Sequence, residues 1–143
     1  MNTVRPDRID RPHLLSLLWI FLLLNFIYCD IIVLHDGGVL QDLIAGRAGA
    51  LDVTPTFLLL VSLLMEIPIA MVLVSRLAAR THNRVANVTA GAIMIVIQTS
   101  SLFAGGAPAT SDWSYLFFSA IELATLVAII TLAIRWKKDT LAA

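Results

Sequence analysis

The chain has 143 residues, of which 59% are hydrophobic and only 14% are charged. A soluble domain usually carries about a quarter charged residues, and so short a chain has too little interior to hide the surplus of apolar side chains. Ten basic and ten acidic residues leave no net charge, so a nucleic-acid partner is not expected. The single cysteine, Cys29, excludes an internal disulfide and a cysteine-based zinc site. The composition predicts one integral membrane domain over residues 1–143.

Four stretches are long and apolar enough to meet the roughly 20 residues that a membrane crossing needs. They are residues 14–34, 55–74, 85–104 and 113–134. Backbone groups in lipid must find partners within their own segment, which predicts helices and not strands. The first stretch is too long for a signal peptide and lacks a small-residue cleavage site, so we expect it to be retained. Short connections predict an all-α bundle of four transmembrane helices, with consecutive helices antiparallel.

Several local signals mark the ends of these helices. Thr54 and Pro55 predict the start of the second helix, and Ser111 and Asp112 that of the fourth. Within residues 35–53, four apolar side chains recur at helical spacing: Val39, Leu40, Leu43 and Ile44. Two interpretations stay open for this segment, a short helix lying on the outer membrane face or a loop with a few buried anchors.

Nine of the ten basic residues fall on one side of the predicted bundle. They precede the first helix, surround the connection between the second and third, and follow the fourth: Arg5, Arg8, Arg11, Arg76, Arg80, Arg84, Arg135, Lys137 and Lys138. Arg47 is the exception. The positive-inside rule therefore predicts cytoplasmic N and C termini, and Trp113, Tyr115 and Trp136 suit the two membrane interfaces.

Three acidic residues are expected inside the membrane, where an ionised side chain costs about 2.5–3.5 kcal/mol and marks a functional site by default. Glu66 and Glu122 are predicted near mid-membrane, and Asp30 in the outer third of the first helix. No lysine or arginine falls within a predicted span. That absence favours a protonated acid or a bound cation over an internal salt bridge.

Other polar residues share helical faces with these acids. If the faces turn inward, the interior holds a polar cluster that opens toward the outside. The predicted ligand-binding or proton-binding residues are Asn25, Tyr28, Asp30, Ser62, Glu66, Gln98, Ser119 and Glu122. Pro68 cannot donate a hydrogen bond to Leu64 and predicts a kink beside Glu66. The alternative for the small polar residues, Thr125 included, is that they only join helices by hydrogen bonds.

No metal or cofactor site is expected. His35 and Asp36, just outside the first helix, could ligate a metal together with Asp30, but three such residues near a loop are weak evidence for a site. A Ser-His-Asp set, a phosphate-binding loop and a zinc motif are not found in the sequence.

Two resemblances add to this interpretation. Residues 18–30, 65–71, 83–87 and 121–122 resemble an uncharacterised family of small four-helix bacterial membrane proteins. That likeness implies a four-helix architecture and a bacterial inner membrane, and it implies no activity. The order of Asp30, Glu66 and Pro68 is also similar, more loosely, to the EXPERA-type proteins, which include sterol isomerases. In that group the acids bind amine ligands or move protons on sterols, and its proline spacing differs from the one here.

Three function classes follow. The first is binding or proton-coupled transport of a small cationic or amphipathic molecule by Glu66 and Glu122, with transport requiring a homodimer. The second is an intramembrane isomerase that uses the same acids on a lipid-like substrate. The third is an assembly subunit of a larger membrane complex, in which the acids only hold helices together. The expected partners are the lipid bilayer, one such ligand and a second copy of the chain.

Overall fold

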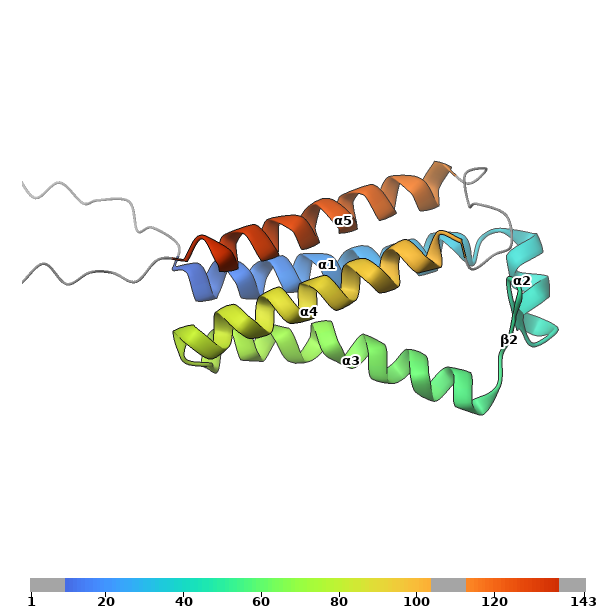
Figure 1. Cartoon of the computed structure of the whole chain (residues 1–143). Helices are drawn as coiled ribbons and strands as arrows, with labels where there is room; N and C mark the ends of the chain where they lie inside the picture. Colours follow the sequence, from blue (N-terminus) through green and yellow to red (C-terminus); the bar gives the residue numbers. More distant parts are fainter. Residues whose placement is uncertain (1–9, 104–112, 137–143) are drawn as a thin grey trace, which may run out of the picture.

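The computed structural model describes residues 10–103 and 113–136. These residues form five α-helices and one short β-hairpin (Figure 1). In chain order they are α1 (Arg11–Val33), α2 (Gly37–Ile44), β1 (Arg47–Ala48), β2 (Leu51–Asp52), α3 (Pro55–Leu77), α4 (Arg80–Ser101) and α5 (Trp113–Ile134).

The four long helices lie side by side with alternating directions (Figure 1). α1 packs against α3 and α5, and α4 packs against the same two helices. The connection between α3 and α4 and the end of α5 lie at one end of the molecule, which we call the basic end. α2, β1 and β2 lie at the opposite end, which we call the hairpin end (Figure 1).

Three of the described helices, α1, α3 and α5, are long and apolar enough to cross a membrane. This identifies the chain as a membrane protein. α4 has 22 residues but is less apolar, because its first two turns contain Arg80, Asn83, Arg84 and Asn87.

Three of the four long helices extend further into polar sequence at the basic end than predicted, whereas α5 has the predicted bounds. α1 begins at Arg11 and not at residue 14, α3 ends at Leu77 and not at 74, and α4 spans Arg80–Ser101 and not 85–104. A prediction from apolar residues alone ends each helix where the polar residues begin. The helical backbone continues further because polar side chains at the helix ends find hydrogen-bond partners. Thr54 caps α3 as predicted, through a 3.1 Å hydrogen bond from Phe57 N to Thr54 Oγ1. The predicted cap at Ser111 and Asp112 lies outside the described residues.

The segment between α1 and α3 contains the short helix that was one of two open interpretations. Asp36 starts α2, because its Oδ1 accepts hydrogen bonds from Gly38 N at 2.7 Å and Val39 N at 3.1 Å. β1 and β2 then pair antiparallel, with Arg47 opposite Asp52. Gly49 has a φ of 61°, the positive region that a tight hairpin turn requires.

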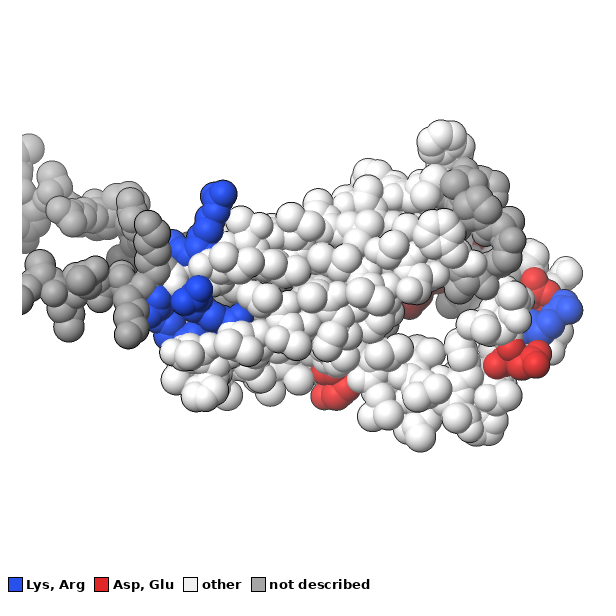
Figure 2. Space-filling model, in the orientation of Figure 1, with Lys and Arg blue, Asp and Glu red and all other residues white. Residues whose placement is uncertain are grey.

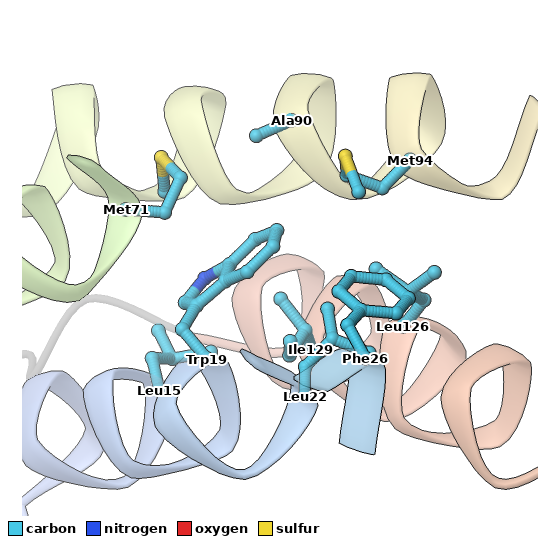
Figure 3. Close-up of a cluster of buried hydrophobic side chains, with 9 residues drawn as sticks. All are labelled: Leu15, Trp19, Leu22, Phe26, Met71, Ala90, Met94, Leu126 and Ile129. Carbon is cyan, nitrogen blue, oxygen red and sulfur yellow. The ribbon is translucent and has the colours of Figure 1, made fainter. Parts of the chain in front are cut away.

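The hydrophobic core lies between the four long helices, nearer the basic end. The residues that α1 contributes follow one another at intervals of three or four, about one helical turn. Trp19 points from α1 toward the methionines of α3 and α4 (Figure 3). The buried cluster consists of Leu15, Trp19, Leu22, Phe26, Met71, Ala90, Met94, Leu126 and Ile129. Gly91 allows α4 and α5 to approach closely, since a Cβ at this position would lie 2.8 Å from Ile130 Cγ1.

Arginines gather at the basic end (Figure 2). Arg84 donates from Nε to the carbonyl of Ala133 at 3.0 Å and from Nη2 to that of Ile134 at 3.1 Å. Arg80 donates from Nη2 to the carbonyl of Trp136 at 2.7 Å. These cations satisfy carbonyls at the C-terminal end of α5, where the helix dipole also favours positive charge.

Candidate functional site

Two groups of polar side chains are buried among the long helices, one in each half of the molecule. The first, which we call the asparagine network, lies toward the basic end. Asn87 Oδ1 accepts hydrogen bonds from Trp19 Nε1 at 2.7 Å and from Ser75 Oγ at 3.2 Å. Asn87 Nδ2 donates to Asn83 Oδ1 at 2.7 Å, and Asn83 Nδ2 donates to the Ser75 carbonyl at 2.6 Å. The network joins α1, α3 and α4, and it uses the polar atoms of both asparagine side chains.

The second group, which we call the glutamate cluster, lies toward the hairpin end between α4 and α5. Gln98 Nε2 donates to Glu122 Oε2 at 2.6 Å and to Ser119 Oγ at 3.1 Å. Ser101 Oγ donates to the Gln98 carbonyl at 2.8 Å and lies 2.8 Å from Tyr115 Oη. Of these contacts, the hydrogen bond from Gln98 is the one that reaches the carboxyl group of Glu122.

A cavity of about 170 Å³ adjoins the glutamate cluster. All four long helices contribute to its wall: Phe26, Cys29, Asp30, Met65, Met94, Ile97, Gln98, Ser101, Tyr115 and Glu122. The wall contains two carboxyl groups and no lysine or arginine. Glu122 is only 1% exposed, whereas Asp30 is exposed. The cavity therefore runs from a buried acid to one that solvent reaches.

Glu122 is not fully satisfied by its neighbours. Its Oε2 accepts from Gln98, but its Oε1 is buried and has no hydrogen-bond partner among the described residues. Leaving a buried polar atom unpaired costs about 1–3 kcal/mol. An acceptor of this kind in a cavity wall favours a ligand that brings a donor.

The cavity lies where α3 separates from the other long helices. α3 diverges from α1 and α4 toward the hairpin end (Figure 1). Its buried residues, Pro68, Met71 and Ser75, all fall in its second half. Figure 2 shows the surface hollowed between α3 and α4 on this side. The packing of the second half of α3 thus leaves space beside its first half.

The structure does not bring all predicted site residues together. Glu66 is exposed on α3 and lies outside the cavity wall, contrary to the expectation that it shares the interior with Glu122. Pro68 is buried and defines the inward face of α3. At 3.6 residues per turn, Glu66 lies about 200° around the helix from Pro68, on the opposite face. Ser62, one turn before Glu66, is exposed with it and donates only to the Leu58 carbonyl of its own helix.

The other predicted residues divide between the interior and the surface. Gln98, Ser119 and Glu122 form the cluster described above, and Asp30 lines the same cavity. Asn25 is buried but does not line the cavity, and its Nδ2 donates to the Phe21 carbonyl within α1, so this bond does not join two helices either. Tyr28 is 58% exposed and takes no part in the cavity wall.

Sequence reasoning missed the asparagine network and part of the cavity wall. Asn83, Asn87, Gly91, Met94 and Gln98 follow one another at spacings of three or four along α4. That periodicity marks one continuous inward face, and it was available in the sequence. Ser101 continues the same spacing, three residues after Gln98. Tyr115 had no such signal, because its contact with Ser101 depends on how α4 and α5 pack.

Within residues 10–103 and 113–136, no group of three or more His, Cys, Asp or Glu side chains is placed to hold a metal ion. Comparison with known protein families matches residues 6–143 to a family of unknown function (DUF6326). Neither a curated protein nor a solved structure matches the chain.

Proposed function

The chain belongs to the family of unknown function DUF6326, and from its structure we propose that it is a four-span membrane protein that binds a small amphipathic cation. The observation that carries the proposal is the cavity between α1, α3, α4 and α5, which is lined by Glu122, a buried acid whose Oε1 has no partner among the described residues.

The distribution of side chains on α4 supports a fourth membrane span. Its polar residues Asn83, Asn87 and Gln98 are buried, whereas Val85 and Val96 are 62% and 65% exposed. A helix at the surface of a soluble protein has the reverse arrangement, with its polar face toward water. Lipid is the solvent that suits an apolar outer face and a polar inner face. The four long helices then form an antiparallel transmembrane bundle.

The charges support an orientation with the basic end in the cytoplasm. Arg11, Arg76, Arg80, Arg84 and Arg135 lie at that end. Arg47, at the hairpin end, is paired with Asp42 at 2.6 Å. The proposal puts both ends of the bundle's chain on the cytoplasmic side and the hairpin outside. A bacterial inner membrane is the membrane that the resemblance to small bacterial membrane proteins implies. Membrane-impermeant thiol labelling of Gly37→Cys, but not of Ala79→Cys, checks this orientation in intact cells. Labelling only at Ala79→Cys would reverse the orientation.

The chemistry of the cavity wall favours a ligand with one positive charge and an apolar body. Asp30 and Glu122 supply negative charge or acceptors, and Phe26, Met65 and Met94 supply apolar contact. Among the described residues, no donor reaches Oε1 of Glu122. A ligand ammonium group would supply a hydrogen-bond donor to this oxygen. A volume of about 170 Å³ is below the usual 300–1,000 Å³ of drug-sized sites, so the ligand is small.

The interior toward the basic end supports binding more than passage through the protein. Trp19, Leu22, Leu126 and Ile129 are each 0% exposed and fill the space there. The cavity therefore ends against a packed core. Transport by the same acids would need a second conformation that opens the packed core. Isomerisation would need chemical turnover of a bound substrate. Binding requires neither.

Ligand-dependent thermal stability of the purified protein in detergent tests the proposal. We expect 2-phenylethylamine to raise the melting temperature of the wild type, and its uncharged alcohol analogue to have a smaller effect. Glu122→Gln and Asp30→Asn should each reduce the amine-dependent rise, because each removes one acid from the cavity wall. Glu66→Gln is the matched control, since Glu66 lies outside the cavity. An equal rise with amine and alcohol, or in the wild type and Glu122→Gln, would refute the proposed site.

A further inference from the structure

A carboxyl group lies on the outer surface of α3 at the middle of its length. Glu66 is eleven residues from each end of the helix Pro55–Leu77. It is exposed, and three leucines on the same helical face are exposed with it, Leu59 at 60%, Leu63 at 59% and Leu73 at 61%. Figure 2 shows acidic atoms at the surface over α3, within an otherwise uncharged flank.

This position is costly if α3 faces lipid there. Because α3 crosses the membrane, its middle lies in the hydrocarbon core, where acidic side chains nearly always face protein or water. Arginine and lysine are not found within α3 until Arg76, at the basic end. Among the described residues, no side chain forms a salt bridge with Glu66. A partner within the membrane must therefore satisfy it.

The chemistry of the group favours a second copy of the same chain. A protonated carboxyl group carries one donor and an acceptor, so two such groups satisfy each other across a twofold axis. With a twofold axis along the membrane normal, two α3 helices cross in parallel orientation and both Glu66 side chains lie at the same depth. A different partner would need a dedicated donor at that depth.

The residues one turn on either side of Glu66 permit close approach. Ser62 and Ala70 lie four residues before and after it, on the same ridge of α3. Small residues at such spacing let two transmembrane helices pack backbone to backbone. The Ser62 hydroxyl donates to the Leu58 carbonyl at 2.8 Å, which leaves its oxygen able to accept a hydrogen bond from the partner helix.

We propose that the protein forms a homodimer through the Ser62–Glu66–Ala70 face of α3, with the two Glu66 carboxyl groups paired at the twofold axis. The inference depends on α3 crossing the membrane and is independent of what the cavity binds. Loss of amine binding would refute the proposed function and leave the dimer standing.

Disulfide crosslinking in native membranes tests the interface. In a Cys29→Ala background, Ser62→Cys and Ala70→Cys are each expected to form covalent dimers on mild oxidation. Val127→Cys on α5 is the matched control, because Val127 is 55% exposed on a different helix. We expect dimer yields at positions 62 and 70 to exceed the control by about fivefold or more, as a specific contact requires. Equal yields at all three positions, or no dimer at 62 and 70, would overturn the proposal.

Two substitutions at Glu66 test the carboxyl pair itself. Glu66→Gln keeps a self-complementary donor and acceptor, and we expect it to retain the crosslink at Ser62→Cys within about twofold. Glu66→Leu removes both the donor and the acceptor, and we expect it to lower the yield of the crosslinked dimer about tenfold. A tenfold change corresponds to the free energy of a strong hydrogen bond between membrane helices. Because the position is exposed, neither change should unfold the monomer. A crosslink unchanged by Glu66→Leu would show that the carboxyl group does not hold the dimer.

Discussion

The two buried polar groups of this protein differ in how completely they are satisfied. In the asparagine network, the side-chain atoms of Asn83 and Asn87 have partners on three helices, and the surrounding interior is packed. In the glutamate cluster, Glu122 Oε1 has no partner among the described residues, and a cavity lies beside it. The chain thus has one polar group whose hydrogen bonds are complete and one with an acceptor to spare.

Under the proposed function, this difference in hydrogen bonding distinguishes the structural group from the binding group better than residue type does. Asparagine and glutamate are both unfavourable in a membrane interior, and sequence reasoning marked Asn25, Glu66 and Glu122 as candidate site residues but not Asn83 or Asn87. A satisfied network rigidifies the helices that it joins. An unsatisfied buried acid raises the free energy of the empty protein, and a ligand that supplies a donor recovers that free energy.

The largest effect is expected from breaking the asparagine network. Asn87→Leu removes the acceptor of Trp19 Nε1 and Ser75 Oγ and the donor to Asn83. We expect the free energy of unfolding to fall by about 2–3 kcal/mol, because several buried polar atoms lose their partner. Asn25→Leu is the control, since among the described residues the Asn25 side chain bonds only within its own helix. A loss at Asn25 equal to that at Asn87, measured by denaturant titration in micelles, would contradict the interpretation.

An intermediate effect is expected where α4 and α5 meet between the two polar groups. A Cβ at Gly91 would lie 2.8 Å from Ile130 Cγ1, so Gly91→Ala should push these helices apart. The expected loss in the free energy of unfolding is about 1–2 kcal/mol. Gly37→Ala is the matched control, because no atom lies within 4 Å of a Cβ at position 37. We expect it to change the free energy of unfolding by less than about 0.5 kcal/mol. Equal losses for the two variants would show that the close approach is unimportant.

The smallest effect on stability is expected at the glutamate cluster. Glu122→Leu removes the unpartnered Oε1, while Gln98 keeps Ser119 as an acceptor at 3.1 Å. We therefore expect the free energy of unfolding to stay within about 1 kcal/mol of the wild type, while amine-dependent stabilisation disappears. If Glu122→Leu destabilises the protein as much as Asn87→Leu, the carboxyl group of Glu122 has a structural role, and the two polar groups do not differ as proposed.

Residue periodicity and local signals predicted part of this structure and part of the site. The Thr54 cap formed as expected, and Gln98 and Glu122 meet in the interior. The same spacing rules misplaced Glu66. Spacing shows which residues share a helical face, but it does not show whether that face packs against another helix or lies at the surface. The inward side of α3 is determined by Pro68, Met71 and Ser75 packing against other helices.

Composition and the run of apolar segments were enough to establish that this is a helical membrane protein, because the cost of burying backbone and charge in lipid leaves few alternatives. Which acid is buried, which is exposed, and where a cavity remains were decided by tertiary packing. Those outcomes depend on the rotation of each helix and on the divergence of α3, and rotation is determined only when side chains from different helices compete for the same interior space.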